Sequence, residues 1–147
     1  MISPELLRRY PYFAQISDAS LKDIAMMAVE KTVPPGTQLF DEGDPADYLN
    51  IIVRGEVIIQ YLLGSGERRT VDTLVTGDIL MWSGLIEPHI STSFGTTTQE
   101  TRLISIDAHK LRDLCERDPQ VGYRLAIQIA KLLAHRLEGA RVQLATV

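Results

Sequence analysis

Apolar and polar positions alternate through the middle of the chain, which is the pattern of half-buried β-strands. The apolar members of the first run are Ile51, Val53, Val57, Ile59 and Tyr61, and the β-branched residues Val71, Thr73 and Val75 repeat the alternation in a second run. The residues Gly64–Glu67 between the two runs predict a hairpin. Many short strands separated by glycine-rich turns predict a closed β-roll over about residues 30–106.

Helical spacing replaces this alternation near the N-terminus. Ser17 is a suitable N-cap for a helix over about residues 18–28. The apolar residues on one face of that helix are Leu21, Ile24, Ala25 and Ala28. The turn-forming sequence at residues 34–36 ends any helical pattern and marks the start of the β-rich region.

The C-terminal region predicts two further helices over about residues 107–145. Asp107 is placed to cap the first and Asp118 the second, with Pro119 at the first helical position of the second. The second helix is predicted to reach about residue 144, which is longer than most helices of globular proteins. The fold class is therefore α+β: one domain over residues 1–147, an antiparallel β-roll with an N-terminal helix and a long C-terminal helix.

Two apolar stripes run along the predicted long helix. One consists of Leu125, Ile129 and Leu132, and the other of Ala126, Ala130, Leu133, Leu137, Ala140 and Leu144. The second stripe alternates spacings of four and three residues, which is typical of a helix–helix seam and predicts a homodimer. The alternative is a single broad face that packs on its own domain.

The charge and residue composition of the chain exclude several classes of function. The chain has a net charge of −4 and its 15 basic residues are scattered, which disfavours nucleic-acid binding. A single cysteine cannot form an internal disulfide, and the three histidines lack metal-ligand spacing, so we expect no metal site. No apolar run is long enough to span a bilayer and no signal peptide is visible, so we expect a cytoplasmic protein without membrane contact.

The stretch from Val33 to Val57 carries three short motifs in order. They are Pro34-Pro35-Gly36, Glu42-Gly43-Asp44, and an apolar strand interrupted at Gly55; Gly77-Asp78-Ile79 follows later. This order resembles the cyclic-nucleotide-binding domain family, which includes catabolite activator protein, the fumarate–nitrate regulator, protein kinase A regulatory subunits and gated channels.

The resemblance extends from about Phe13 to about Ala140 and implies the β-roll and the long helix. Glycines at its tight turns permit a positive φ. These structural glycines are Gly36, Gly43, Gly55 and Gly77. It also implies a cyclic nucleotide, cAMP or cGMP, as the ligand, and signalling through the long helix. Relatives of the catabolite-activator branch carry a helix-turn-helix domain after that helix; this chain stops without one, so we do not expect it to bind DNA by itself.

The ligand cassette of the family would follow Gly77-Asp78. The resemblance implies a glutamate for the ribose and an arginine for the phosphate, but Trp82 and Ser91 stand at those positions, while Thr92 keeps an adjacent hydroxyl. Without these charged anchors we do not expect tight cAMP binding in the usual mode. The candidate ligand-binding residues are Met81, Trp82, Ser83, Gly84, Leu85, Ser91, Thr92, Ser93 and Arg136.

Several of these residues have an ordinary structural alternative. Trp82 lines or plugs a pocket, or it simply packs in the core. The hydroxyls of residues 91–93 bind an anion, or they form polar strand surface. Arg136 stacks on a base or reaches a phosphate across a dimer, or it is a solvated helix residue.

Three further residues are candidates for a role in ligand binding. Arg54 or Arg102, on predicted strands, would replace the missing cation if its side chain faced inward. His89 is a candidate axial ligand for haem, as in some proteins of this fold, although we do not expect haem.

These observations predict a regulatory sensor domain and not an enzyme, since no set of acid, base and nucleophile is visible. Its ligand would be a cyclic nucleotide held in an altered mode, or another small molecule. The alternatives are a ligand-free dimerisation or docking module, and the sensor part of a truncated transcription regulator.

Overall fold

Short helices build the N-terminal end of the computed structural model, which describes residues 2–146. They are α1 (Pro4–Arg8), the 3-10 helix η1 (Pro11–Phe13) and α2 (Asp18–Met26). The Ser17 hydroxyl caps α2 by accepting a hydrogen bond from the Ser20 N–H at 3.3 Å. The helix is shorter than predicted, because Ala28 already pairs with Ile106 as the first residue of the next strand.

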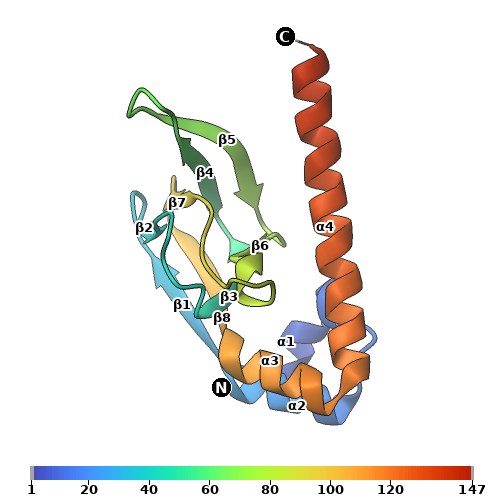
Figure 1. The fold of residues 1–147 in the computed structure, drawn as a ribbon. Coiled ribbons are helices and arrows are strands. Elements are labelled where there is room, and N and C mark those ends of the chain that lie inside the picture. Colours follow the sequence, from blue (N-terminus) through green and yellow to red (C-terminus); the bar gives the residue numbers. More distant parts are fainter. Residues whose placement is uncertain (1, 147) are drawn as a thin grey trace.

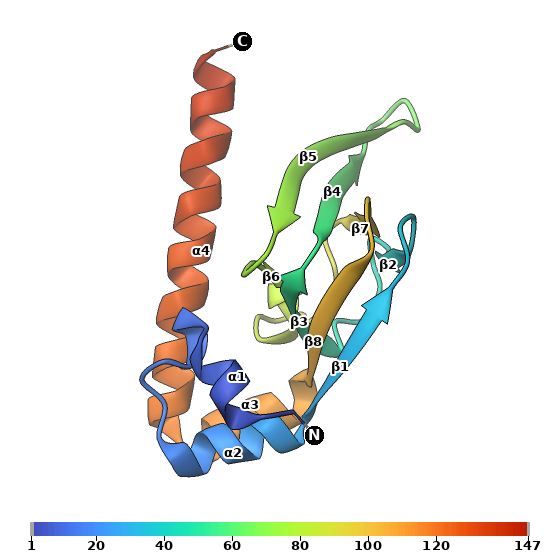
Figure 2. The ribbon, with the colours of Figure 1, turned by 180° about the vertical axis from the view of Figure 1, so that it is seen from behind.

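Within the described residues, eight strands form two antiparallel four-stranded sheets that face each other (Figures 1 and 2). The first sheet has the order β1-β8-β3-β6, with β1 (Ala28–Val33), β8 (Thr101–Asp107), β3 (Tyr48–Arg54) and β6 (Ile79–Leu80). The second has the order β2-β7-β4-β5, with β2 (Gln38–Phe40), β7 (Phe94–Thr97), β4 (Glu56–Leu62) and β5 (Arg68–Val75). Together they form the expected β-roll.

Gly55 is the point at which the chain leaves one sheet for the other. It separates β3 from β4 and has φ 128°, where a side chain would be strained. A Cβ at this position would lie 2.4 Å from Thr101 Oγ1, so the close approach also requires glycine. The other three structural glycines also have positive φ, namely Gly36 (78°), Gly43 (89°) and Gly77 (91°).

Residues 63–67 join β4 and β5 as a hairpin, as predicted, but the inward side of β5 differs from the prediction. Leu74 is buried and Asp72 half-buried, whereas Val71 and Val75 are exposed. Asp72 pairs with Ile59 and Thr70 pairs with Gln60, so Val71 is the extra residue of a β-bulge. This pairing fixes the register and therefore the face that each β5 side chain takes.

Two apolar clusters make up the core. The smaller one lies between the sheets and contains Phe40, Ile52, Val57, Leu74, Leu80 and Leu103. The larger one joins the first sheet to the N-terminal helices and to the C-terminal helices α3 (Ala108–Arg117) and α4 (Pro119–Ala145). The predicted inner face of α3 is present, with Leu111 and Leu114 buried and Cys115 half-buried.

The caps of these two helices differ. The Asp107 carboxylate accepts a hydrogen bond from the Lys110 N–H at 3.0 Å, as an N-cap should. Asp118 makes no such side-chain bond to α4; its carboxylate instead accepts from the Ser20 hydroxyl at 2.6 Å. Asp118 therefore ties the start of α4 to α2.

The two ends of α4 have different surroundings. Its first half packs on the domain, while its second half stands beside the β4–β5 hairpin and extends away from the sheets (Figure 1). None of the described helices, α4 included, has the length and apolar character that crossing a membrane requires.

Candidate ligand cavity

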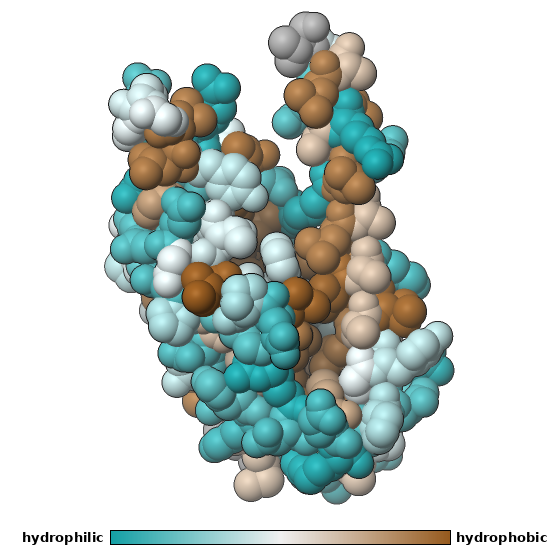
Figure 3. Space-filling model, viewed as in Figure 1, coloured by the Kyte–Doolittle hydropathy of each residue, from teal (hydrophilic) through white to brown (hydrophobic). Residues whose placement is uncertain are grey.

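A cavity of about 270 Å³ lies where β4, β5 and β6 meet the loop before β7 and the second half of α4. Most of its lining side chains are apolar. The lining residues are Phe40, Ile59, Tyr61, Val71, Asp72, Leu74, Ile79, Leu80, Met81, Trp82, Ser83, Ser91, Thr92, Ser93, Leu133, Arg136 and Ala140. Figure 3 shows hydrophobic residues on both sides of the hollow between the hairpin and α4.

The cavity brings together most of the candidate ligand-binding residues. Those that line it are Met81, Trp82, Ser83, Ser91, Thr92, Ser93 and Arg136. Gly84 and Leu85 do not. Gly84 packs on α3, where a Cβ would lie 3.1 Å from the Ala108 Cβ, and its carbonyl accepts a hydrogen bond from Arg112 at 2.6 Å. Leu85 faces a separate cavity.

The cassette has little regular structure. Met81 adopts a left-handed conformation (φ 64°) and is followed by the single-turn 3-10 helix η2 (Trp82–Gly84). Trp82 is half-buried and contacts the larger core cluster while it also lines the cavity. The two interpretations of Trp82, as a pocket wall and as a packing residue, therefore apply together.

The Ser91 hydroxyl is engaged in its own loop. It donates to the Ser93 carbonyl at 2.8 Å and accepts from the Ser93 N–H at 3.3 Å, and Ser91 is only 4% exposed. Because the hydroxyl proton is already donated to the Ser93 carbonyl, it is not directed at an anion in the cavity. Thr92 is exposed.

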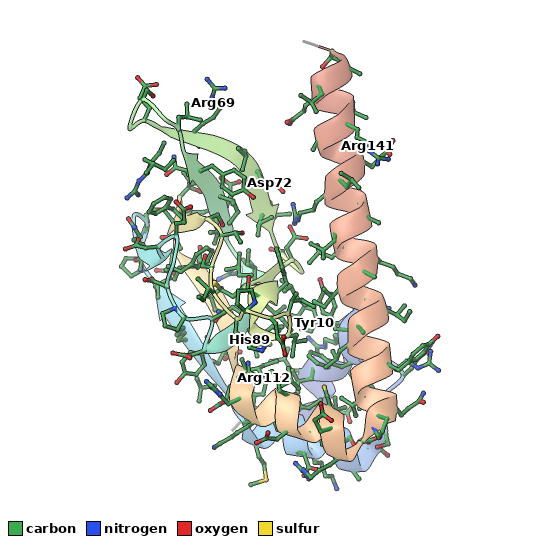
Figure 4. All side chains as sticks on the ribbon, viewed as in Figure 1. Tyr10, Arg69, Asp72, His89, Arg112 and Arg141 are labelled. Atoms are coloured by element: carbon green, nitrogen blue, oxygen red, sulfur yellow. The ribbon has the colours of Figure 1, made fainter. Side chains whose placement is uncertain are left out.

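Arg136 is not the solvated helix residue that one interpretation expected. It forms an ion pair with Asp72 through Nη1, and its Nη2 lies 3.7 Å from Asp78 Oδ2. The Arg136 side chain is 24% exposed. Figure 4 shows Asp72 on the side of β5 that faces α4, which is why the arginine turns inward. We call Asp72, Arg136 and Asp78 the charge cluster.

The turn before β6 is also tied to the N-terminal helices. The Tyr12 hydroxyl of η1 donates to the Gly77 carbonyl at 2.9 Å. Burial raises the pKa of Tyr12, the Asp78 carboxylate raises that pKa further, and Arg136 opposes the shift. Two elements, η1 and α4, therefore contact the turn that follows β5.

Sequence reasoning missed Asp72, Leu133 and Ala140 as cavity residues. Leu133, Arg136 and Ala140 share one face of α4 by their spacing of three and four residues, a signal that the sequence contained. Leu133 and Ala140 were predicted in the dimer seam, but Leu133 packs against the core of its own domain and both line the cavity. The prediction missed Asp72 because it took Val71, Thr73 and Val75 as the alternating set, whereas Asp72 shares the inward side with Leu74.

The other candidate residues lie elsewhere. His89 lines a second cavity of about 260 Å³ with Arg112 and Cys115, and its Nδ1 is 3.0 Å from the Ser83 carbonyl oxygen. Arg54 and Arg102 line a polar surface pocket, where Arg102 pairs with Glu30 at 2.9 Å. Neither arginine replaces the missing cation. Within residues 2–146 no cluster of three or more His, Cys, Asp or Glu side chains could hold a metal ion.

Comparison with known proteins now identifies the fold. The model of the cyclic nucleotide-binding domain matches residues 30–118. The CRP-like cAMP-activated global transcriptional regulator of Mycobacterium tuberculosis is 27% identical over 141 residues, which cover 96% of this chain and 61% of that relative. The chain therefore spans less than two thirds of this relative.

Solved structures agree with the sequence match. A Geobacter metallireducens protein described as cyclic nucleotide-binding is 36% identical with a TM-score of 0.84, covering 93% of this chain and 99% of that one. The catabolite activator protein of Thermus thermophilus shares the fold, at 22% identity and a TM-score of 0.71 over 92% of this chain and 62% of that chain. The chain belongs to the cyclic nucleotide-binding domain family.

Proposed function

We propose that this chain is the sensor domain of a regulatory protein, in which a small molecule in the cavity sets the position of α4. The observation that carries the proposal is the composition of the cavity wall. Residues 81–83 of the cassette form one side, and Leu133, Arg136 and Ala140 of α4 form another. An occupant would contact both, and a ligand shifts a conformational equilibrium only through such differential contacts.

The proposed ligand is held mainly by apolar contacts and not by the phosphate anchors of the family. Trp82 and Ser91 stand where the resemblance places a glutamate and an arginine. The cavity of about 270 Å³ is slightly smaller than the usual range for small-molecule sites, roughly 300–1,000 Å³, and suits a small ligand. An open cavity of this size favours ligand binding over a ligand-free docking module.

Homodimerisation is part of the proposal, through the exposed members of the seam on α4. Leu137 is 52% exposed and Leu144 is 77% exposed, and an exposed apolar stripe at helical spacing suits a second helix. Sedimentation should detect a dimer that the L137E/L144E variant abolishes. Leu62→Glu, at an exposed leucine of β4, is the matched control and should leave the dimer intact.

We propose the cytoplasm as the location, because a single unpaired cysteine suits a reducing compartment. We propose no contact of this chain alone with nucleic acid, because its net charge is −4.

Trp82 makes the cavity directly observable, because it is the chain's single tryptophan. The neutral fluorophore N-phenyl-1-naphthylamine (NPN), excited by energy transfer from Trp82, should bind saturably to the wild-type protein. Thr92→Phe should abolish this binding, because Thr92 is exposed and lines the cavity. Thr73→Phe is the matched control, since Thr73 is exposed on β5 and does not line it.

The cyclic nucleotides are tested in the same assay. We expect cAMP and cGMP to give no saturable change at submillimolar concentration. NPN binding that is absent, or equal in the two phenylalanine variants, would contradict a ligand site in this cavity.

A further inference from the structure

The charge balance of the cavity defines the class of ligand more closely. Among the residues that the structure describes as lining it, Arg136 is the only arginine or lysine and Asp72 the only carboxylate. Asp78 lies just behind them, 3.7 Å from Arg136. The charge cluster thus sets two carboxylates against one guanidinium and carries a formal net charge of −1.

Other cations do not correct this balance. Figure 4 shows Arg69 toward the free end of the hairpin and Arg141 on the side of α4 turned away from β5. Arg68 lies over the Phe94 ring, 3.9 Å from its centroid, and is not a cavity residue. An anion that entered the cavity would therefore meet a guanidinium already engaged by two carboxylates.

The partners of the cluster are also held in place by the backbone. Asp78 Oδ2 accepts a hydrogen bond from the Val75 N–H at 2.8 Å, and Asp72 Oδ1 accepts from the Thr73 N–H at 2.9 Å. Neither carboxylate can turn away without losing that bond. An anionic ligand at Arg136 would compete with both carboxylates for the charge of the guanidinium and would meet their repulsion at close range.

We infer that the charge cluster is a specificity determinant that excludes anionic ligands, including phosphates, and reserves the cavity for an uncharged, largely apolar small molecule. This inference rests on the proposed function of the cavity. The cluster does two things at once: it neutralises the one cation of the cavity, and it joins α4 to β5. An uncharged ligand leaves both roles intact.

Two probes of nearly identical shape test the inference. NPN is uncharged, and 8-anilinonaphthalene-1-sulfonate (ANS) is the same ring system with one added sulfonate. In the wild-type protein, energy transfer from Trp82 should show ANS binding at least about tenfold more weakly than NPN. In the D72N/D78N variant the freed guanidinium should strengthen ANS binding about 10- to 100-fold and leave NPN binding unchanged.

The amide substitutions keep the backbone hydrogen bonds, because an asparagine oxygen also accepts from an N–H. The triple variant D72N/D78N/R136L shows whether the gain depends on the guanidinium, and its ANS affinity should fall back to the wild-type value. Circular dichroism confirms that each variant is folded.

The outcomes separate this inference from the proposed function. Absent NPN binding overturns the proposed function. Normal NPN binding combined with equally tight ANS binding in the wild-type protein overturns the charge inference alone. An equal rise in the affinities for both probes in D72N/D78N also overturns it, and so does a rise in ANS affinity that persists in D72N/D78N/R136L. In either case the cluster would act by restraining α4 and not by charge.

Discussion

The two halves of α4 are held in place by different kinds of interaction. In the first half Val121, Leu125 and Ile129 are at most 3% exposed and belong to the larger core cluster. In the second half Leu137 and Leu144 are 52% and 77% exposed, and beyond the core contact of Leu133 the ion pair of Arg136 links the helix to the β-roll. The same helix is thus a core element at one end and a projecting arm at the other.

This difference shows how one helix can serve both stability and signalling. Burial of apolar side chains is strong and does not depend on the cavity. A partly exposed ion pair is weak, with a typical worth of about 0–1 kcal/mol. The second half can therefore shift when the cavity changes, while the first half stays fixed.

The largest expected effect is a loss of folding stability from a substitution in the first half of α4. Leu125→Ala should lower the free energy of unfolding by about 2–5 kcal/mol, because the lost side chain leaves a hole in the core. Leu144→Ala should change it by less than about 0.5 kcal/mol in the monomer. Urea unfolding at a concentration where sedimentation shows monomer measures both. Similar losses for the two variants would contradict the comparison.

A smaller effect is expected at the joint between α2 and α4. Ser20 is 7% exposed, and its hydroxyl donates to the Asp118 carboxylate. Ser20→Ala should cost about 1–3 kcal/mol in urea unfolding, because a charged acceptor loses its partner. Ser65→Ala, in the exposed hairpin turn, is the control and should cost less than about 0.5 kcal/mol.

The ion pair of the second half should show a local effect rather than a global one. Arg136→Leu should change the free energy of unfolding by less than about 1 kcal/mol. Hydrogen exchange in residues 137–145 should accelerate by up to about fivefold, because the helix loses its link to β5. Arg141→Leu is the control. Equal acceleration along all of α4 would show that the halves are not independent.

The smallest effect concerns pH and the contact of η1 with the turn before β6. Burial raises the pKa of Tyr12 in the folded protein above its ordinary value of about 10. The folded state therefore holds the proton more tightly, and the stabilisation is complete below about pH 10 and lost as pH rises through the folded pKa. The stability difference between wild type and Tyr12→Phe should be constant below about pH 10 and shrink as the pH rises above it. A difference that stays constant would contradict this.

The sequence predicted the fold well because its signals were local. Ser17 and Asp107 are caps, and the turn glycines need a positive φ; each is visible without knowing the rest of the structure. Asp72 needed long-range information, because its inward orientation is set by the pairing of β5 with β4, in which Asp72 lies opposite Ile59 and Leu74 opposite Val57. The ion pair of Arg136 with Asp72 could not be predicted locally either, because 64 residues separate the two.

The cassette shows a similar limit of prediction from sequence: the position of its residues could be predicted, but their contacts could not. Alignment placed Trp82 and Ser91 at the anchor positions, and both do line the cavity. Nothing local indicated that the Ser91 hydroxyl would bond to the Ser93 backbone, or that Gly84 would pack closely on Ala108 of α3. Residue identity thus predicted the location of the cavity better than its hydrogen bonding.

Hydrogen exchange along α4, with and without saturating NPN, tests the central claim most directly. The account predicts that NPN changes deuterium uptake in residues 133–145, which include the cavity wall, and leaves residues 119–130 unchanged. The Trp82 signal reports in the same sample that the probe is bound. A bound probe that changes both halves alike, or neither half, would contradict the account.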